Sequence, residues 1–106
     1  MRAVGPYTVP VSFLLERRLR VIGRRLASLR EELTLADEQL AHLADLTDDS
    51  RIRAMVSETP LADVEHREAE RTSSAMARHR IDLVESIQRL EREQDDLLDK
   101  LSARGR

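Results

Sequence analysis

The sequence predicts an all-α protein, an antiparallel coiled-coil helical hairpin with a short linker helix at its closed end. Three observations support this class. Leu and Ala dominate the apolar residues, while charged residues make up 36% of the 106-residue chain, a balance typical of long amphipathic helices. Apolar residues recur with heptad spacing in two long stretches. Aromatic residues, which would help to fill a globular core, are limited to Tyr7 and Phe13.

Residues 1–10 are expected to form a flexible lead-in, because Gly5, Pro6 and Pro10 punctuate this segment. The apolar residues from Val9 to Leu15 are too few for a signal sequence or a membrane span. The chain has no Cys, which excludes disulfides and cysteine metal sites. We therefore expect a cytoplasmic protein.

The helical hairpin domain is expected to span residues 11–103, with a first helix over residues 11–46. This helix carries an apolar series whose spacings alternate between four and three residues without a break. The series is Leu15, Leu19, Ile22, Leu26, Leu29, Leu33, Ala36, Leu40 and Leu43. Such alternation averages 3.5 residues and defines a coiled-coil seam. The a positions of this seam, Leu19, Leu26, Leu33 and Leu40, lack the β-branched residues that favour a parallel dimer, which leaves an antiparallel pairing or a bundle open.

A second long helix is expected over residues 60–103. Thr59 can cap its free amides, and Pro60 fits the first helical position, where no N–H is needed. Its seam has the same spacing and comprises Ala62, His66, Ala69, Ser73, Met76, Arg80, Leu83, Ile87, Leu90, Gln94, Leu97 and Leu101. The seam has four polar members, His66, Ser73, Arg80 and Gln94. One interpretation is that they fix the register and the choice of partner helix. The other is that the long stems of Arg80 and Gln94 carry their polar ends out of the seam.

A short linker helix is expected over residues 49–57, capped by Asp48 or Asp49. It carries Ile52, Met55 and Val56 on one side, and all three would be exposed on a bare loop. The small residues Ala62, Ala69 and Ser73 leave room for this segment to fold back onto the second long helix. The alternative is that it packs against a second subunit.

A second partial apolar stripe, formed by Ala77, Ile81, Val84 and Leu98, runs beside the seam of the second long helix. A lone hairpin covers one stripe of each helix, so this one implies a further packing partner. The predicted partner or oligomer interface consists of Ile81, Val84, Leu98, Ile52, Met55 and Val56. We expect a homo-oligomer, or a protein partner whose helix replaces the second subunit.

Charge is distributed unevenly, because residues 1–30 hold seven Arg against Glu16, whereas residues 31–58 hold eight acids against two Arg. The possible anion patch is Arg17, Arg18, Arg20, Arg24 and Arg25. Antiparallel pairing would set these arginines beside acids of the second long helix, among them Glu91 and Glu93, which favours a neutralised or solvated face. Alternatively, these arginines bind the phosphates of nucleic acid or anionic lipid, although neither is expected as a partner.

Enzymatic residues are not recognisable in the chain. It has no nucleophilic triad and no glycine-rich phosphate loop, and its His residues, His42, His66 and His79, lack the paired spacing of a metal motif. Thin helical hairpins also rarely provide a catalytic cleft. We expect no catalytic residues, no metal and no cofactor.

The segment from Arg78 to Leu83 resembles part of the helix of developmental anti-sigma factors of filamentous actinobacteria, small antiparallel coiled coils that clamp a sigma factor with cyclic di-GMP. That family places Glu, Ser, Arg, Gln and Asp at spacings of four, three, four and four. The closest register here is Asp82, Ser86, Arg89, Glu93 and Leu97. Ser86 and Arg89 match the family pattern, Asp82 and Glu93 are near substitutes, and Leu97 departs from it. The segment from Asp49 to Asp63 is similar to uncharacterised small coiled-coil proteins of high-G+C actinobacteria.

Together these features predict a non-enzymatic coiled-coil adaptor or regulatory protein that acts through protein–protein binding. One alternative is an anti-sigma-like transcription regulator. A second is a peripheral membrane-surface protein that uses the Arg17–Arg25 basic stretch.

Overall fold

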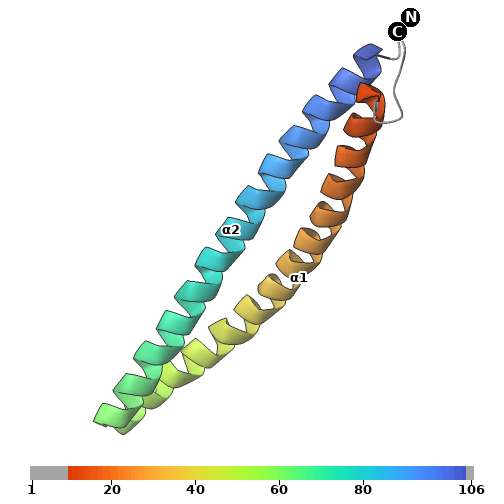
Figure 1. Cartoon of the computed structure of the whole chain (residues 1–106). Helices are drawn as coiled ribbons and strands as arrows, with labels where there is room; N and C mark the ends of the chain where they lie inside the picture. The colour runs from red at the N-terminus through yellow and green to blue at the C-terminus, as the bar shows by residue number, and fades with distance from the viewer. Residues whose placement is uncertain (1–9, 105–106) are drawn as a thin grey trace, which may run out of the picture.

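The computed structural model describes residues 10–104, which form two α-helices joined by a two-residue turn. Helix α1 spans Val11–Ser57 and helix α2 spans Pro60–Arg104. The helices run antiparallel and pack against each other, so the molecule is a rod with the turn at its closed end (Figure 1). This arrangement confirms the predicted all-α helical hairpin. Of the expected flexible lead-in, only Pro10 lies within the described residues.

Hydrogen bonds at both helix ends fix the turn. Glu58 follows α1 in a left-handed conformation with φ of 51°, and its backbone N–H donates to the Ala54 carbonyl at 3.2 Å. The Thr59 hydroxyl oxygen accepts a hydrogen bond from the Ala62 backbone N–H at 3.2 Å. Pro60 occupies the first helical position, where its missing N–H costs nothing. The predicted cap at Thr59 is confirmed.

The prediction of a separate linker helix over residues 49–57 is wrong, because α1 continues without interruption to Ser57. Asp48 and Asp49 therefore lie inside a long helix and cap nothing. Thr, Asp and Ser favour helix ends, since their side chains compete for backbone groups. Contacts with α2 override this preference here, because the Thr47 hydroxyl donates to the Ala69 carbonyl at 3.4 Å.

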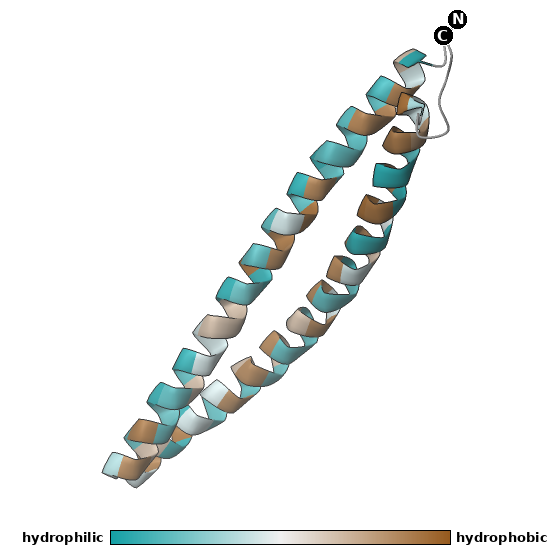
Figure 2. Cartoon of the chain, viewed as in Figure 1, coloured by the Kyte–Doolittle hydropathy of each residue, from teal (hydrophilic) through white to brown (hydrophobic). Residues whose placement is uncertain are grey.

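The predicted heptad seam is confirmed on both helices. Every member of the α1 series from Leu15 to Leu43 is buried or half-buried, and so is every member of the α2 series from Ala62 to Leu101. Figure 2 shows the same pattern as hydrophobic colouring on the facing sides of the two helices. The most deeply buried side chains, none more than 2% exposed, are Ile22, Leu26 and Leu29. Burying side chains of this size stabilises the hairpin by ~1.5–3 kcal/mol each.

Two hydrogen-bonded contacts near the turn set the register between the helices. Thr47 lies across from Ala69, and Ser50 lies across from His66. Heptad steps carry this register toward the open end, where α1 begins and α2 ends. The layers so defined are Leu43/Ser73, Leu40/Met76, Ala36/Arg80, Leu33/Leu83, Leu29/Ile87, Leu26/Leu90, Ile22/Gln94, Leu19/Leu97 and Leu15/Leu101.

Arg80 shows how a charged residue fits this seam. The register places it opposite Ala36, whose small side chain is 3% exposed and leaves room for the arginine stem. The Arg80 guanidinium reaches out of the seam and donates to the Asp37 carboxylate. Long arginine stems commonly cover apolar surface in this way while the charged end stays in water. The interpretation that Arg80 carries its charge out of the seam is confirmed.

The two halves of the rod have different cores. Toward the open end, the core cluster of Ile22, Leu26, Leu29, Leu83 and Ile87 is made of large apolar side chains. Toward the turn, the layers are Thr47/Ala69, Ser50/His66 and Ala54/Ala62, which are small or polar. Most of the hydrophobic stabilisation therefore lies in the half that is farther from the turn.

Candidate protein-binding surfaces

The predicted interface residues of α2 lie beside the seam and remain accessible. Ile81 and Leu98 are 54% and 48% exposed, and Val84 is half-buried. The heptad register places them on one side of the rod together with Ala77 and with Ala44 of α1. We call the set Ala77, Ile81, Val84 and Leu98 the α2 stripe. Within residues 10–104, the hairpin half-buries Ala77 and Val84 and leaves Ile81 and Leu98 exposed.

The predicted interface residues near the turn are also exposed, but they do not fold back. Ile52, Met55 and Val56 are 54%, 68% and 79% exposed. The prediction that they pack onto α2 within the chain is wrong, because they lie on the outer side of α1 and the helix continues through them without interruption. Contact with a second subunit stays a prediction.

Two further apolar side chains near the turn escaped the sequence analysis. Leu61 is 68% exposed and Val64 is 39% exposed, and both lie on the outer side of α2. Both are apolar residues that lie outside the four-and-three spacing of the α2 seam, and this combination could have identified them as exposed from the sequence.

The predicted interface residues form two separate surfaces. Met55 lies beside the turn, at the level of the first turn of α2. Ile81 lies about 20 residues farther along α2, which corresponds to ~30 Å at 1.5 Å per residue. A single small partner helix would have to span that distance to contact both surfaces.

Ion pairs across the hairpin neutralise part of the predicted anion patch. The Arg18 guanidinium donates two hydrogen bonds to the Glu93 carboxylate, at 2.8 and 2.9 Å. Hydrogen bonding from Arg18 holds the pKa of Glu93 below its usual value, and the same contact raises the pKa of Arg18. Arg30 pairs with Glu91 at 3.0 Å. The predicted matching of opposite charges across the hairpin is confirmed at these two points.

The remaining arginines of the patch are not neutralised in this way. Arg17, Arg20, Arg24 and Arg25 make no ion pair within 4.0 Å to any residue among 10–104. Exposed pairs such as Arg18–Glu93 contribute only ~0–1 kcal/mol, because water screens them. The patch is thus a largely uncompensated basic surface.

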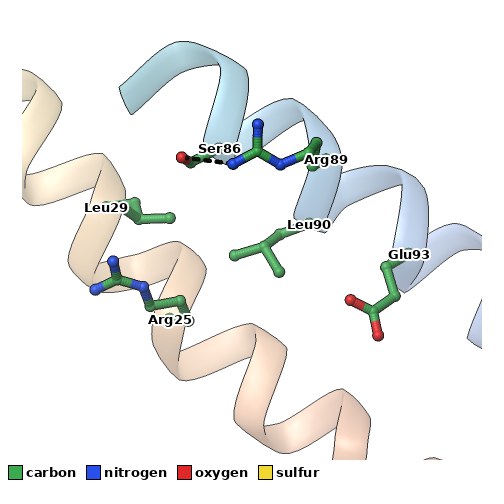
Figure 3. A pocket seen from close by; sticks show the side chains of 6 residues that line it. All are labelled: Arg25, Leu29, Ser86, Arg89, Leu90 and Glu93. Carbon is green, nitrogen blue, oxygen red and sulfur yellow. Dashed lines mark hydrogen bonds between the residues drawn. The ribbon is translucent and has the colours of Figure 1, made fainter. Parts of the chain in front are cut away.

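A shallow groove of about 380 Å³ lies between the helices on the side opposite the α2 stripe (Figure 3). Leu29 and Leu90 meet across its floor, and Arg25 borders it from α1. On the α2 side, Arg89 donates to the Ser86 hydroxyl at 3.1 Å. The groove has guanidinium, hydroxyl and carboxylate groups at its edge but no deeply buried polar group.

The groove also contains part of the register that the sequence analysis compared with the anti-sigma factors. Ser86, Arg89 and Glu93 line it, and the Glu93 carboxylate is already held by Arg18. Leu97 is partly buried and packs against the hydrophobic core. The fifth position of that register therefore contributes to the seam, not to the groove.

A small polar network lies in the core near the turn. Ser50, only 4% exposed, donates its hydroxyl proton to the Thr47 carbonyl at 2.8 Å, and its oxygen lies 3.0 Å from His66 Nδ1. The other ring nitrogen of His66 contacts the Glu70 carboxylate. The polar seam position predicted at His66 is therefore occupied by a hydrogen-bonded layer.

Among residues 10–104, no cluster of three or more His, Asp or Glu side chains is arranged to hold a metal ion. Neither α1 nor α2 contains a stretch that is long and apolar enough to cross a membrane. Comparisons with protein-family models, curated proteins and solved structures found no match.

Proposed function

We propose that this chain is a non-enzymatic adaptor or regulatory protein of the cytoplasm that binds another protein through the α2 stripe. The observation that carries the proposal is the exposure of Ile81 and Leu98 next to a seam that is already complete. Leaving apolar surface in water forfeits ~25 cal/mol for every Å² that a partner could cover. A second apolar stripe on a helix is the usual sign of a further packing partner.

The geometry favours an amphipathic helix as the binding partner. The small side chains of Ala44 and Ala77 face the same side of the rod as Ile81 and Val84, so a third helix can approach closely between α1 and α2. Its apolar residues, spaced three and four apart, would contact the stripe in the manner of a helix in a groove. The product would be a three-helix bundle over the middle of the rod.

Ion pairs on this side of the rod provide a polar border. The Asp37–Arg80 pair and the Arg30–Glu91 pair both cross the hairpin there. Charged groups at the border of an apolar patch contribute to specificity and orientation more than to affinity. We expect the partner helix to carry complementary charges beside its apolar residues.

Site-specific photo-crosslinking tests this proposal. A photoreactive residue at position 81 should capture a protein partner in cells, whereas the same residue in place of Ala75, on the outer side of α2, should not. Ile81→Asp combined with Val84→Asp should abolish capture at a third stripe position, Leu98, whereas Ala75→Asp should leave it intact. Equal capture at positions 81 and 75 would argue against the α2 stripe.

The identity of the protein crosslinked at position 81 distinguishes the proposed adaptor from the anti-sigma-like regulator and the peripheral membrane protein. A sigma factor would support the anti-sigma-like regulator. Loss of membrane association after substitution of Arg20 and Arg24, with no protein captured at position 81, would support the peripheral membrane protein.

A further inference from the structure

The outer side of α1, which faces away from α2, carries apolar residues that the hairpin does not use. They lie at both ends of the helix and at its centre. Their exposed fractions are 46% for Phe13, 49% for Leu14, 57% for Leu35, 68% for Met55 and 79% for Val56. Isolated exposed apolar residues are normal on a protein surface, but these five share one side of one helix.

Charged residues on the same side of α1 are segregated by sign, except for Glu31, an acid in the first half. Arg17, Arg20 and Arg24 lie in the first half, and Asp45, Asp48 and Asp49 lie in the second half. Asp48 has an ion-pair partner, Arg51 on the same helix at 3.5 Å. Within residues 10–104, the other five make no ion pair. The outer side therefore has a basic half and an acidic half, each with an apolar end.

We propose that a second copy of this chain binds here, with its α1 packed antiparallel against the first. A two-fold axis between Thr34 and Leu35 then brings the basic half of each copy onto the acidic half of the other. Each contact occurs twice, as an isologous interface requires. The facing pairs in this register are Phe13 with Val56, Leu14 with Met55, Arg20 with Asp49, Arg24 with Asp45, and Ser28 with Ala41.

The register matches the chemistry at most levels of the interface, the exceptions being Arg17 opposite Ile52 and Val21 opposite Asp48. Apolar residues meet apolar residues at both ends, and the two copies of Leu35 lie beside the axis. Four Arg–Asp contacts, two in each half, fix the direction of the partner helix. A parallel arrangement would set Arg20 against Arg20 and Asp45 against Asp45, and like charges disfavour it. In the antiparallel register Glu31 of each copy faces Glu38 of the other, and these two unfavourable contacts are outnumbered by the four Arg–Asp contacts.

This interface is distinct from the surface of the proposed function. The α2 stripe lies on the other helix of the hairpin, so a dimer through α1 leaves Ile81 and Val84 free for a protein partner. It also gives Met55 and Val56 the second-subunit contact expected from the sequence. Failure of the dimer would leave the photo-crosslinking test of the α2 stripe unaffected.

Charge reversal with mixing tests the interface. One variant carries Arg20→Glu and Arg24→Glu, and the other carries Asp45→Lys and Asp49→Lys. In sedimentation equilibrium at micromolar concentration, the wild type should sediment at twice its 12.2 kDa mass. Each variant alone should dimerise at least about tenfold more weakly, because all four Arg–Asp contacts become repulsive. An equimolar mixture should recover the dimer, since the four contacts that involve positions 20, 24, 45 and 49 then join charges of opposite sign.

Disulfide trapping tests the antiparallel direction. The chain has no Cys, so Leu14→Cys and Met55→Cys each introduce a single thiol. Mild oxidation of the mixed variants should give a crosslink between positions 14 and 55, whereas each variant alone should crosslink poorly. Self-crosslinking of Leu14→Cys without the mixed product would indicate a parallel dimer and overturn the proposal.

A matched control on the other helix completes the design. Ile81→Ser with Val84→Ser should leave the dimer unchanged. A wild-type monomer throughout the micromolar range would overturn the proposal. A dimer that survives both charge-reversal variants but is lost with the substitutions at 81 and 84 would overturn it as well and place self-association on α2.

Discussion

At the scale of single residues, Glu58 has an unusual backbone conformation for its type. Among residues 10–104, Glu58 is the one non-glycine residue with a positive φ. A side chain in the left-handed region costs ~1–2 kcal/mol, and for this reason glycine is preferred directly after a helix. The strain persists because the N–H of Glu58 closes the last turn of α1 on Ala54.

Replacing this residue with glycine should stabilise the hairpin. Glu58→Gly should raise the free energy of unfolding by up to about 1 kcal/mol, part of the gain being lost to the greater freedom of glycine in the unfolded chain. Urea denaturation should show a higher midpoint at an unchanged slope. Glu58→Ala keeps the unfavourable φ and should give no such gain, so equal midpoints for the two variants would contradict the explanation.

The Arg18–Glu93 ion pair should give a measurable pH dependence. Hydrogen bonding from Arg18 lowers the pKa of Glu93 in the folded state. The pair therefore contributes to stability at neutral pH, and the contribution is lost as the pH falls through the lowered pKa. Carboxyl-detected NMR should find the pKa of Glu93 below that of an ordinary Glu and nearer to it in Arg18→Gln. An identical pKa in the two proteins would show that the pair does not persist in solution.

At the scale of secondary-structure elements, the sequence predicted the seam well. The spacing of four and three identified every buried or half-buried position from Leu15 to Leu43, because large apolar residues mark them. The same spacing continues through Thr47, Ser50 and Ala54, all buried or half-buried, but small and polar residues leave no apolar signal there. The helix was therefore expected to end at residue 46, although it continues to Ser57.

For the candidate surfaces too, apolar spacing along one helix identified the residues but not their contacts with the other helix. Ile81 and Leu98 were recognisable because they lie off a seam that is already complete. The destination of Ile52, Met55 and Val56 could not be read from the sequence, because it depended on whether the chain bends near Thr47. The pairing of Ser50 with His66 joins residues from different helices. Periodicity within one helix carries no information about such a contact.

The polar layers should make the closed end the less stable part of the rod. Amides around Ser50 should exchange with deuterium faster than those around Leu26, because local opening near the turn exposes little apolar surface. His66→Leu should slow this exchange and add about 1 kcal/mol to the free energy of unfolding, since Ser50 keeps its bond to the Thr47 carbonyl. Uniform protection along α1 in the wild type would contradict this account.

At the scale of the whole molecule, the strongest layers are far from the turn that connects the helices. The Leu26/Leu90 layer joins residues separated by about sixty positions, whereas the Ala54/Ala62 layer beside the turn joins close neighbours. The first residue of α1 and the last residue of α2 lie together at the open end (Figure 1). Stability and chain connectivity are thus concentrated at opposite ends of the rod.

This arrangement affects how the chain folds. A hairpin with strong contacts beside its turn can close from the turn outward, whereas here a long loop must close before large side chains are buried. A circular permutant, opened between Glu58 and Thr59 and joined from Arg104 to Val11 by a short flexible linker, would bring the strong layers next to the connection. Stopped-flow refolding of the permutant should be several-fold faster than that of the natural chain. Loop closure, more than helix formation, would then limit the folding rate of the natural chain.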